Sequence, residues 1–256
     1  MSDLILYEHP LNERMRTLLR LERLFDEIAF HMGRDEPWNA RQCIRAILDT
    51  TCALTRSDLK SELLKETDRL INVLEGIQRS AGIDTGRLDE TLERLNRVVA
   101  QLRNQPGQIG QKLRCDEFLT SVAQRSAIPG GDCSFDLPAL HYWLQKPADQ
   151  RRADLAEWLS ELAPVRRATD LLLSLIRDSA VAEPRHATRG VYQHDQEEGR
   201  IARLLRIGLD PAIPCHVEVS GGKHRYTIRF IDMSRGLSRP VPADYDIAFQ
   251  LTACLL

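Results

Sequence analysis

Cys133, Ser134 and His141 bring nucleophile and base side chains into one short stretch of the sequence. Such a set could serve covalent catalysis, in which a nucleophile attacks and an imidazole takes its proton. Catalytic partners are brought together by the fold, however, and closeness in the sequence is poor support for that geometry. Cys133 is more simply interpreted as a small buried hydrophobic residue, and His141, beside Tyr142 and Trp143, as a packed histidine. We therefore predict no catalytic residues and no enzyme.

Gly221, Gly222 and Lys223 form a second stretch that could do chemistry. The stretch lacks the earlier glycine, the following Ser or Thr and the helix that a phosphate-binding loop requires, so it predicts a hairpin turn. The six cysteines contain no C-x-x-C pair, and the seven histidines share no spacing. We predict neither a metal site nor a cofactor.

Arginines are the better indication of function. Arg16, Arg20 and Arg23 recur at i, i+4 and i+7, so they share one face of a helix. A solvated face is the ordinary interpretation of such a stripe, and a docking surface for an acidic partner is the alternative. Other basic residues lie on or beside the other expected elements: Arg56, Lys60, Lys112, Arg114, Lys223, Arg225 and Arg229.

These basic residues could converge on one concave face if the helical part and the strands abut. Exposed charge pairs contribute about 0–1 kcal/mol each, whereas micromolar affinity needs about −8 kcal/mol. Charge alone is therefore insufficient, and we expect Leu, Phe or Tyr side chains between the arginines to supply apolar anchors.

The composition is that of a globular chain with a local charge asymmetry. Its 256 residues fit one large or two modest domains, and its net charge of −2 does not indicate wholesale nucleic-acid binding. Ten Lys and Arg stand against six Asp and Glu between Arg185 and Arg239, a local +4 that leaves −6 for the rest. The asymmetry favours an anionic partner for the C-terminal part. We find no signal peptide, no apolar run of about 18 residues and no paired cysteines, which predicts a cytoplasmic protein without membrane insertion.

Helical spacing of apolar residues dominates the first part of the chain. Proline costs little in a first helical turn, so the first helix is expected to begin at Pro10. About eight helices are expected, over Pro10 to Met32, Trp38 to Leu54, Asp58 (or Ser57) to Leu74, Asp84 to Leu102, Gln111 to Arg125, Asp136 to Leu144, Ala148 to Leu162 and Pro164 to Ser179.

The pattern changes after Glu183 and Pro184 to short strands separated by Gly and Pro. Strands are expected at Val191–Gln193, Ile201–Ile207, His216–Ser220, His224–Ile231 and Tyr245–Ala253. Strand side chains alternate between two faces. The fourth of these strands therefore turns Tyr226, Ile228 and Phe230 inward and Arg225, Thr227 and Arg229 outward.

The stretch Leu4–Glu8 also alternates weakly and has no local partner. We predict that it joins the C-terminal sheet and ties the two ends of the chain together. Its helix would then carry Arg16 and Arg20 towards Arg225 and Arg229. The expected fold class is α+β, with a mainly helical domain over residues 10–182 and a segregated antiparallel β domain over residues 1–9 and 183–256.

Several stretches resemble the ZapD family of Z-ring-associated bacterial cell division proteins. The longest reads IPGGDCSFDLPALHYWL, from Ile128 to Leu144. The others are Tyr7–Arg16, Glu62–Glu66, Ile109–Arg114 and Lys223–Phe230. Together they run in order along nearly the whole chain.

The resemblance implies a helical domain plus a β domain, a homodimer and no catalysis. It implies binding to the C-terminal tail of FtsZ, the tubulin-like GTPase of the division ring, with bundling of FtsZ filaments, Z-ring assembly at mid-cell and lower GTPase activity. The family's partner-binding surface is basic. Carried over by position, the FtsZ-binding residues are Arg16, Arg20, Arg56, Lys112, Arg114, His141, Lys223, Arg225 and Arg229.

A nucleic-acid-binding module that uses the basic sheet is the alternative function. Such a module would present aromatic rings for stacking on bases. Only 5% of the residues are aromatic, and Tyr226 and Phe230 share the expected inward face. An enzyme is the third possibility, and no nucleophile–base pair or metal-binding set supports it.

Overall fold

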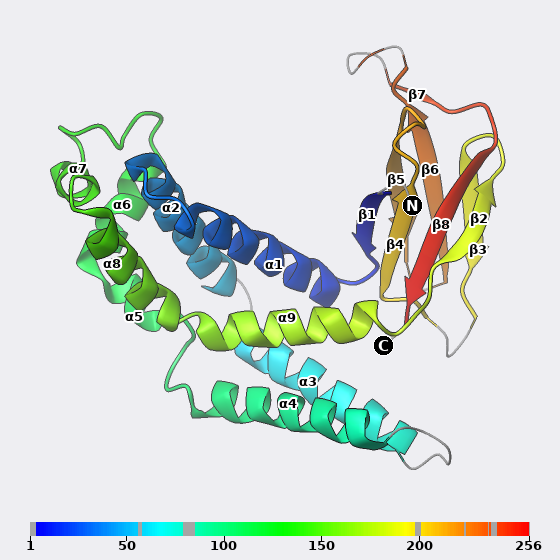
Figure 1. Ribbon diagram of the computed structural model, residues 1–256, viewed down its shortest axis with the longest axis horizontal. Helices are drawn as coiled ribbons and strands as arrows, with labels where there is room; N and C mark the ends of the chain where they lie inside the picture. Colours follow the sequence, from blue (N-terminus) through cyan, green and yellow to red (C-terminus); the bar gives the residue numbers. More distant parts are fainter. Residues whose placement is uncertain are drawn as a thin grey trace. The chain divides into compact units, whose positions relative to one another are not determined.

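The computed structural model describes residues 4–55, 58–78, 85–197, 201–222, 224–234, 236 and 240–255. Helices come first and antiparallel strands last, with the N-terminal strand added to a C-terminal sheet (Figure 1). The predicted α+β class is therefore confirmed. The chain divides into two compact units, unit 1 (Met1–Leu19 and Leu173–Leu256) and unit 2 (Arg20–Leu172).

The helices of the described residues largely follow the predicted apolar periodicity. The structure splits the expected fifth helix at Asp116, whose carboxylate accepts the Leu119 N–H and caps a new helix. The helices are α1 (Glu13–Met32), α2 (Pro37–Thr55), α3 (Leu59–Gln78), α4 (Thr85–Asn104), α5 (Gln111–Cys115), α6 (Glu117–Ser126), α7 (Pro138–Leu144), α8 (Ala148–Ser160) and α9 (Ala163–Arg177). None of them is long and apolar enough to cross a bilayer.

Pro10 does not begin the first helix as predicted. It ends strand β1 (Ile5–Pro10), where it pairs in register with Leu204. The missing N–H of proline is tolerated there because β1 is an edge strand. Helix α1 begins at Glu13 instead, and the Asn12 side chain accepts the Met15 N–H as its cap.

The strands form two antiparallel sheets, where the sequence suggested one. The order of sheet A is β1-β4-β8-β2, and sheet B contains β3-β6-β5 with β7 also paired to β6. The sequence missed β2 and β7, the first because Pro184 obscured another edge strand. Besides β1, the strands are β2 (Glu183–Ala187), β3 (Val191–Asp195), β4 (Leu204–Leu209), β5 (Cys215–Gly221), β6 (Arg225–Asp232), β7 (Val241–Pro242) and β8 (Ile247–Cys254).

A tight turn at Gly190 carries the chain from sheet A to sheet B. Gly190 has φ of 70°, and a Cβ there would lie 2.5 Å from the Ala243 carbonyl oxygen. Only glycine therefore fits, because it alone adopts this conformation freely and has no side chain to clash. The turn lets β2 and β3 lie at the edges of different sheets.

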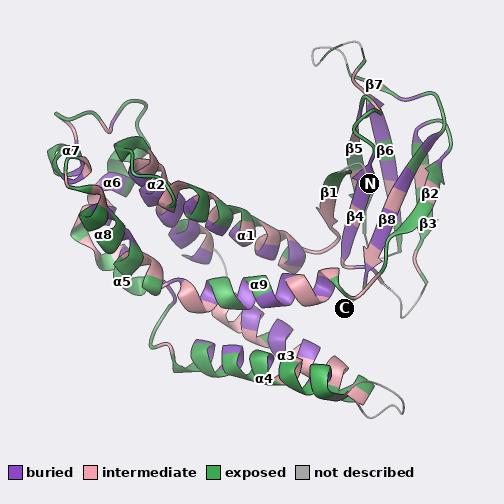
Figure 2. Cartoon of the chain, viewed as in Figure 1, coloured by how far each residue is buried: buried purple, intermediate pink, exposed green. Residues whose placement is uncertain are grey.

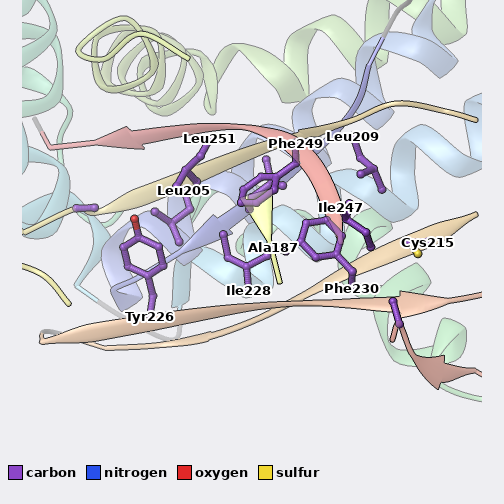
Figure 3. Packing of buried hydrophobic residues seen from close by; sticks show 13 residues of the cluster. Ala187, Leu205, Leu209, Cys215, Tyr226, Ile228, Phe230, Ile247, Phe249 and Leu251 are labelled. Carbon is purple, nitrogen blue, oxygen red and sulfur yellow. The ribbon is translucent and has the colours of Figure 1, made fainter. Parts of the chain in front are cut away.

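The two sheets bury an apolar core between their inner faces (Figure 3). Phe230 of β6 and Phe249 of β8 meet across the core with ring centroids 5.2 Å apart. Buried residues of β6 and β8 largely alternate with half-buried or exposed ones, whereas β4 is buried along most of its length (Figure 2). Each sheet covers the apolar face of the other. A single sheet would leave its apolar face exposed to water.

Unit 2 is held by apolar helix faces and by one aromatic cluster. Helices α3 and α4 lie side by side and bury Leu63, Leu70, Leu95 and Leu102 among others (Figure 1). In the cluster, Trp143 of α7 lies 5.9 Å from the Phe118 ring of α6 and 5.8 Å from the Trp158 ring of α8. The third and fourth predicted helices therefore have the inner faces that their leucine spacing indicated.

A carboxylate bridges three elements of unit 1. Glu8 of β1 accepts two hydrogen bonds from Arg177 of α9, at 2.8 Å from Nε and 2.6 Å from Nη2. The same carboxylate accepts a 2.9 Å bond from Arg206 Nε of β4. The three side chains are only 19–28% exposed. Bidentate, charge-assisted bonds of this kind are among the stronger polar contacts in proteins.

The neighbouring His9 is kept neutral by its surroundings. Burial first, and the Arg16 guanidinium second, lower its pKa from 6.5. Both causes act by disfavouring the imidazolium form.

Replacing Glu8 by Gln tests the carboxylate bridge. The amide would place N–H groups against two guanidinium groups, so we expect E8Q to lower the free energy of unfolding by about 2 kcal/mol. E13Q is the matched control, because Glu13 is 85% exposed and pairs only within α1. It should cost less than about 0.5 kcal/mol. Equal losses for both variants in urea denaturation would contradict the bridge.

His9 should make the fold sensitive to mild acid. The unfolded state takes up a proton near pH 6.5 more readily than the folded state does, so stability falls as the pH drops below that value. Between about pH 7.5 and 5.5, H9Q should lose less free energy of unfolding than the unmodified protein. R16Q should also reduce this loss of stability in acid, but by less than H9Q does, because burial lowers the pKa of His9 more than the Arg16 charge does. An unchanged pH dependence in H9Q would overturn this assignment.

Candidate docking surface

Strand β6 separates basic from apolar side chains. Tyr226, Ile228 and Phe230 are buried, whereas Arg225 and Arg229 are exposed and Thr227 between them is half-buried. The predicted alternation is thus confirmed. The outward side chains of β6 include no aromatic ring, so this face lacks the stacking groups of the nucleic-acid alternative.

Carboxylates on the neighbouring strands accompany the two arginines. Arg225 pairs in register with Asp195 of β3, and its Nε donates to the Asp195 carboxylate. Arg229 lies in register with Glu218 of β5, whose carboxylate is 3.6 Å from His216 Nε2. Among the described residues, Arg229 has no ion pair. The outward face of sheet B therefore carries both charges. Arg225 is in an ion pair there, and Arg229 is in none among the described residues.

The sequence interpretation included these carboxylates in the local net charge but did not place them opposite the two arginines. Asp195 and Glu218 are both exposed, and each faces an arginine across the sheet. Strand register was the signal that could have found them, since directly opposite residues share a face. An exposed pair of this kind contributes little, and another carboxylate can replace its acid.

The segment that leads into α1 lies beside the hairpin that leads into β6. A Cβ on Gly221 would approach Leu11 Cδ2 to 3.0 Å, and the Leu11 N–H donates to Arg203 O at 2.9 Å. The Gly222 N–H donates to Arg225 O at 3.0 Å, which confirms the predicted hairpin turn. Lys223 lies outside the described residues. Unit 1 thus brings the start of α1 to the end of sheet B where Arg225 stands.

Arg16 lies in the first turns of α1, and its Nε donates to Glu13 at 3.0 Å. Its effect on the pKa of His9 shows that its charge acts on β1. Arg20 follows one turn later on the same helix, in unit 2, and is exposed. Among the described residues it has no ion pair.

The remaining candidates belong to unit 2 and have different surroundings. Lys112 Nζ donates to Glu161 and borders a cavity of about 750 Å³. Arg114 donates to Ile109 O at 3.0 Å and to the Gln108 side chain at 3.1 Å, so it braces the loop before α5. Arg56 lies outside the described residues. The convergence of the unit 1 and unit 2 candidates on one surface stays a prediction.

Two predicted burials are wrong. His141 is exposed on α7 because the helix turns Leu140 and Trp143 inward. Cys133 is exposed in the loop before α7. Among the described residues, no hydrogen bond joins the Cys133 thiol to His141, and no three His, Cys, Asp or Glu side chains group as metal ligands would.

Comparison with known proteins gives a consistent result. Residues 19–229 match the family model described as "ZapD: Cell division protein". A "Cell division protein ZapD" of Methylococcus capsulatus is 40% identical over 258 residues and covers 100% of both chains. One of Nitrosomonas eutropha is 41% identical, over 99% of this chain and 100% of its own. One of Chromobacterium violaceum is 36% identical, over 98% and 99%.

Proposed function

The chain belongs to the ZapD family of cell division proteins, and from this premise we propose that it binds the C-terminal tail of FtsZ. By this contact it cross-links and bundles FtsZ protofilaments, promotes Z-ring assembly at mid-cell in the cytoplasm, and lowers FtsZ GTPase activity. No cofactor and no catalytic step take part. The observation that carries the proposal is the outward face of β6, where Arg225 and Arg229 project from a rigid sheet.

In the proposed binding step, carboxylates of the FtsZ tail become the partners of the two arginines. Asp195 and Arg225 are 68% and 58% exposed, so their pair contributes at most about 1 kcal/mol and is easily replaced. A tail carboxylate can accept from the Arg225 guanidinium in place of Asp195, and a second can accept from Arg229. Guanidinium groups bind carboxylates in a bidentate geometry, which orients the tail as well as holding it.

Other basic residues extend the same contact in the proposal. They are Arg16, Arg20, Arg56, Lys112, Arg114, Lys223 and His141. Leu11, half-buried beside the hairpin, is a candidate for one of the apolar anchors that affinity requires.

Cross-linking requires two binding sites on one particle. A two-fold homodimer presents the same surface twice, so it can hold the tails of two filaments at once. Each filament offers many tails, and avidity then makes bundling strong even where a single contact is weak.

Co-sedimentation with FtsZ filaments tests the proposal directly. The protein should pellet with filaments of intact FtsZ and stay in the supernatant with filaments that lack the C-terminal tail. Equal pelleting with both would rule out the tail as the binding element. Analytical ultracentrifugation of the protein alone should show a dimer.

Charge reversal at Arg225 tests the site. We expect R225E to weaken binding of an FtsZ tail peptide at least about tenfold, because one attractive contact becomes a repulsive one. R97E is the control, since Arg97 of α4 is similarly exposed (66% against 58%), also pairs with an acid, and is not a candidate. Unchanged thermal unfolding and dimerisation should accompany the loss. Tail binding by R225E at the level of R97E would refute the assignment.

Salt should weaken bundling. Exposed charges are screened over about 8 Å at 0.15 M ionic strength and over about 3 Å at 1 M. Light scattering by mixtures with FtsZ should therefore fall steeply between low salt and several hundred millimolar KCl. Filament formation without the protein, measured at each salt concentration, is the control. Bundling that persists undiminished would exclude a mechanism led by charge.

A further inference from the structure

The two sheets of unit 1 part at one end and leave a cavity between them. Its volume is about 490 Å³, within the range of small-molecule sites. Its walls come from β2, β3, β6, β8 and adjoining segments.

The inward-facing residues of the strands explain why the space between the sheets becomes more polar towards the cavity. The residues of β2 that face inward run from buried Ala187 to half-buried Arg185, and those of β6 run from Phe230 and Ile228 to Tyr226. The core is thus purely apolar in its middle. It becomes aromatic and polar where the cavity opens.

Tyr226 supplies a polar group at the inner end of the cavity. The residue is only 2% exposed, and its hydroxyl points away from β6 into the space between the sheets (Figure 3). Among the described residues this hydroxyl has no hydrogen-bond partner. The hydroxyl faces the cavity, so a ligand bound there can accept a hydrogen bond from it. Burial raises the pKa of Tyr226, so the hydroxyl keeps its proton and can donate.

The walls beside this hydroxyl are suited to a flat ring. The Tyr192 and His194 rings lie within 6° of parallel, with centroids 6.5 Å apart, and His194 is 5.2 Å from the Tyr226 ring. Leu251, Ala253 and Leu255 of the β8 segment supply an aliphatic wall. Aromatic rings pack favourably on both kinds of surface.

The charges at the cavity do not favour an anion. Glu183 and Arg185 pair with each other, and Glu197 adds a further carboxylate. The acidic peptide proposed for the outward face of β6 would therefore be a poor ligand here. The favoured ligand is neutral.

We propose that this cavity binds a small neutral aromatic compound with a carbonyl oxygen that accepts a hydrogen bond from the Tyr226 hydroxyl. The ring packs between the Tyr192 and His194 side chains and the aliphatic wall of β8. The site is separate from the surface proposed for FtsZ, because Tyr226 and Arg225 point to opposite faces of β6.

Ligand-observed NMR with benzamide as the probe tests the proposal. Benzamide should receive saturation from the protein at about millimolar concentration, and benzoate, its anionic counterpart, should receive much less. Y226F should bind benzamide about three- to tenfold more weakly, since one hydrogen bond is lost while the ring stays. Y245F is the matched control, because the Tyr245 hydroxyl contacts Cys215 and does not line the cavity. It should bind as the unmodified protein does.

H194A is a second test variant in case Y226F is unstable, because His194 lies on the exposed rim of the cavity. H194A should bind benzamide more weakly, since one of the packing rings is removed. Both variants should keep full affinity for the FtsZ tail. No saturation transfer to benzamide, equal binding of benzoate, or unaltered affinity in both Y226F and H194A would overturn the proposal.

Discussion

The Glu8 carboxylate, shared between Arg177 and Arg206, is the contact on which the arrangement of unit 1 depends. Glu8 lies in the N-terminal strand, Arg177 at the end of α9 and Arg206 in β4, so one side chain joins segments far apart in the sequence. The contact fixes β1 at the edge of sheet A. Because Leu11 follows directly and contacts the β5–β6 hairpin, the position of β1 also sets where α1 begins. The location of Arg16 therefore follows from a partly buried ion pair.

Alternation along β6 explains how one strand can serve both the stability of the core and the proposed recognition of a partner. Its inward residues complete the core, and its outward residues are free to vary without disturbing that core. The exposed carboxylates opposite the arginines do not cancel this surface. Asp195 holds Arg225 extended over sheet B, and the weak exposed pair leaves the guanidinium available to a stronger acceptor. In the proposed complex, a tail with several carboxylates would gain by replacing such pairs together, because the entropy cost of ordering the tail arises only once.

The sequence predicted those features that depend on local periodicity. The alternation of β6, the leucine faces of α3 and α4, and the pairing of the N-terminal strand all followed from apolar spacing. It failed where a tertiary contact overrides a local preference. Pro10 favours a helix start but is accepted at a sheet edge, and the Asp116 cap divides an apolar run that reads as one helix. The exposure of His141 depends on which side of α7 contacts α6 and α8. The turn between the two sheets requires glycine at position 190, because a Cβ there would clash with the Ala243 carbonyl oxygen, and only the folded structure reveals this proximity.

The two faces of β6 differ in the ligands that they are suited to bind. Arg225 and Tyr226 are adjacent in the chain, yet Arg225 lies on the exposed face of sheet B and Tyr226 lines a cavity whose charged wall residues are Glu183, Glu197 and Arg185. An acidic ligand on the outer face and a neutral ring on the inner face do not compete for the same groups. They can influence each other only through the backbone of β6, which β3 and β5 hold on both sides. Since a sheet held on both sides resists displacement, the two faces should bind independently, and any coupling between them would require movement of β3 at the sheet edge.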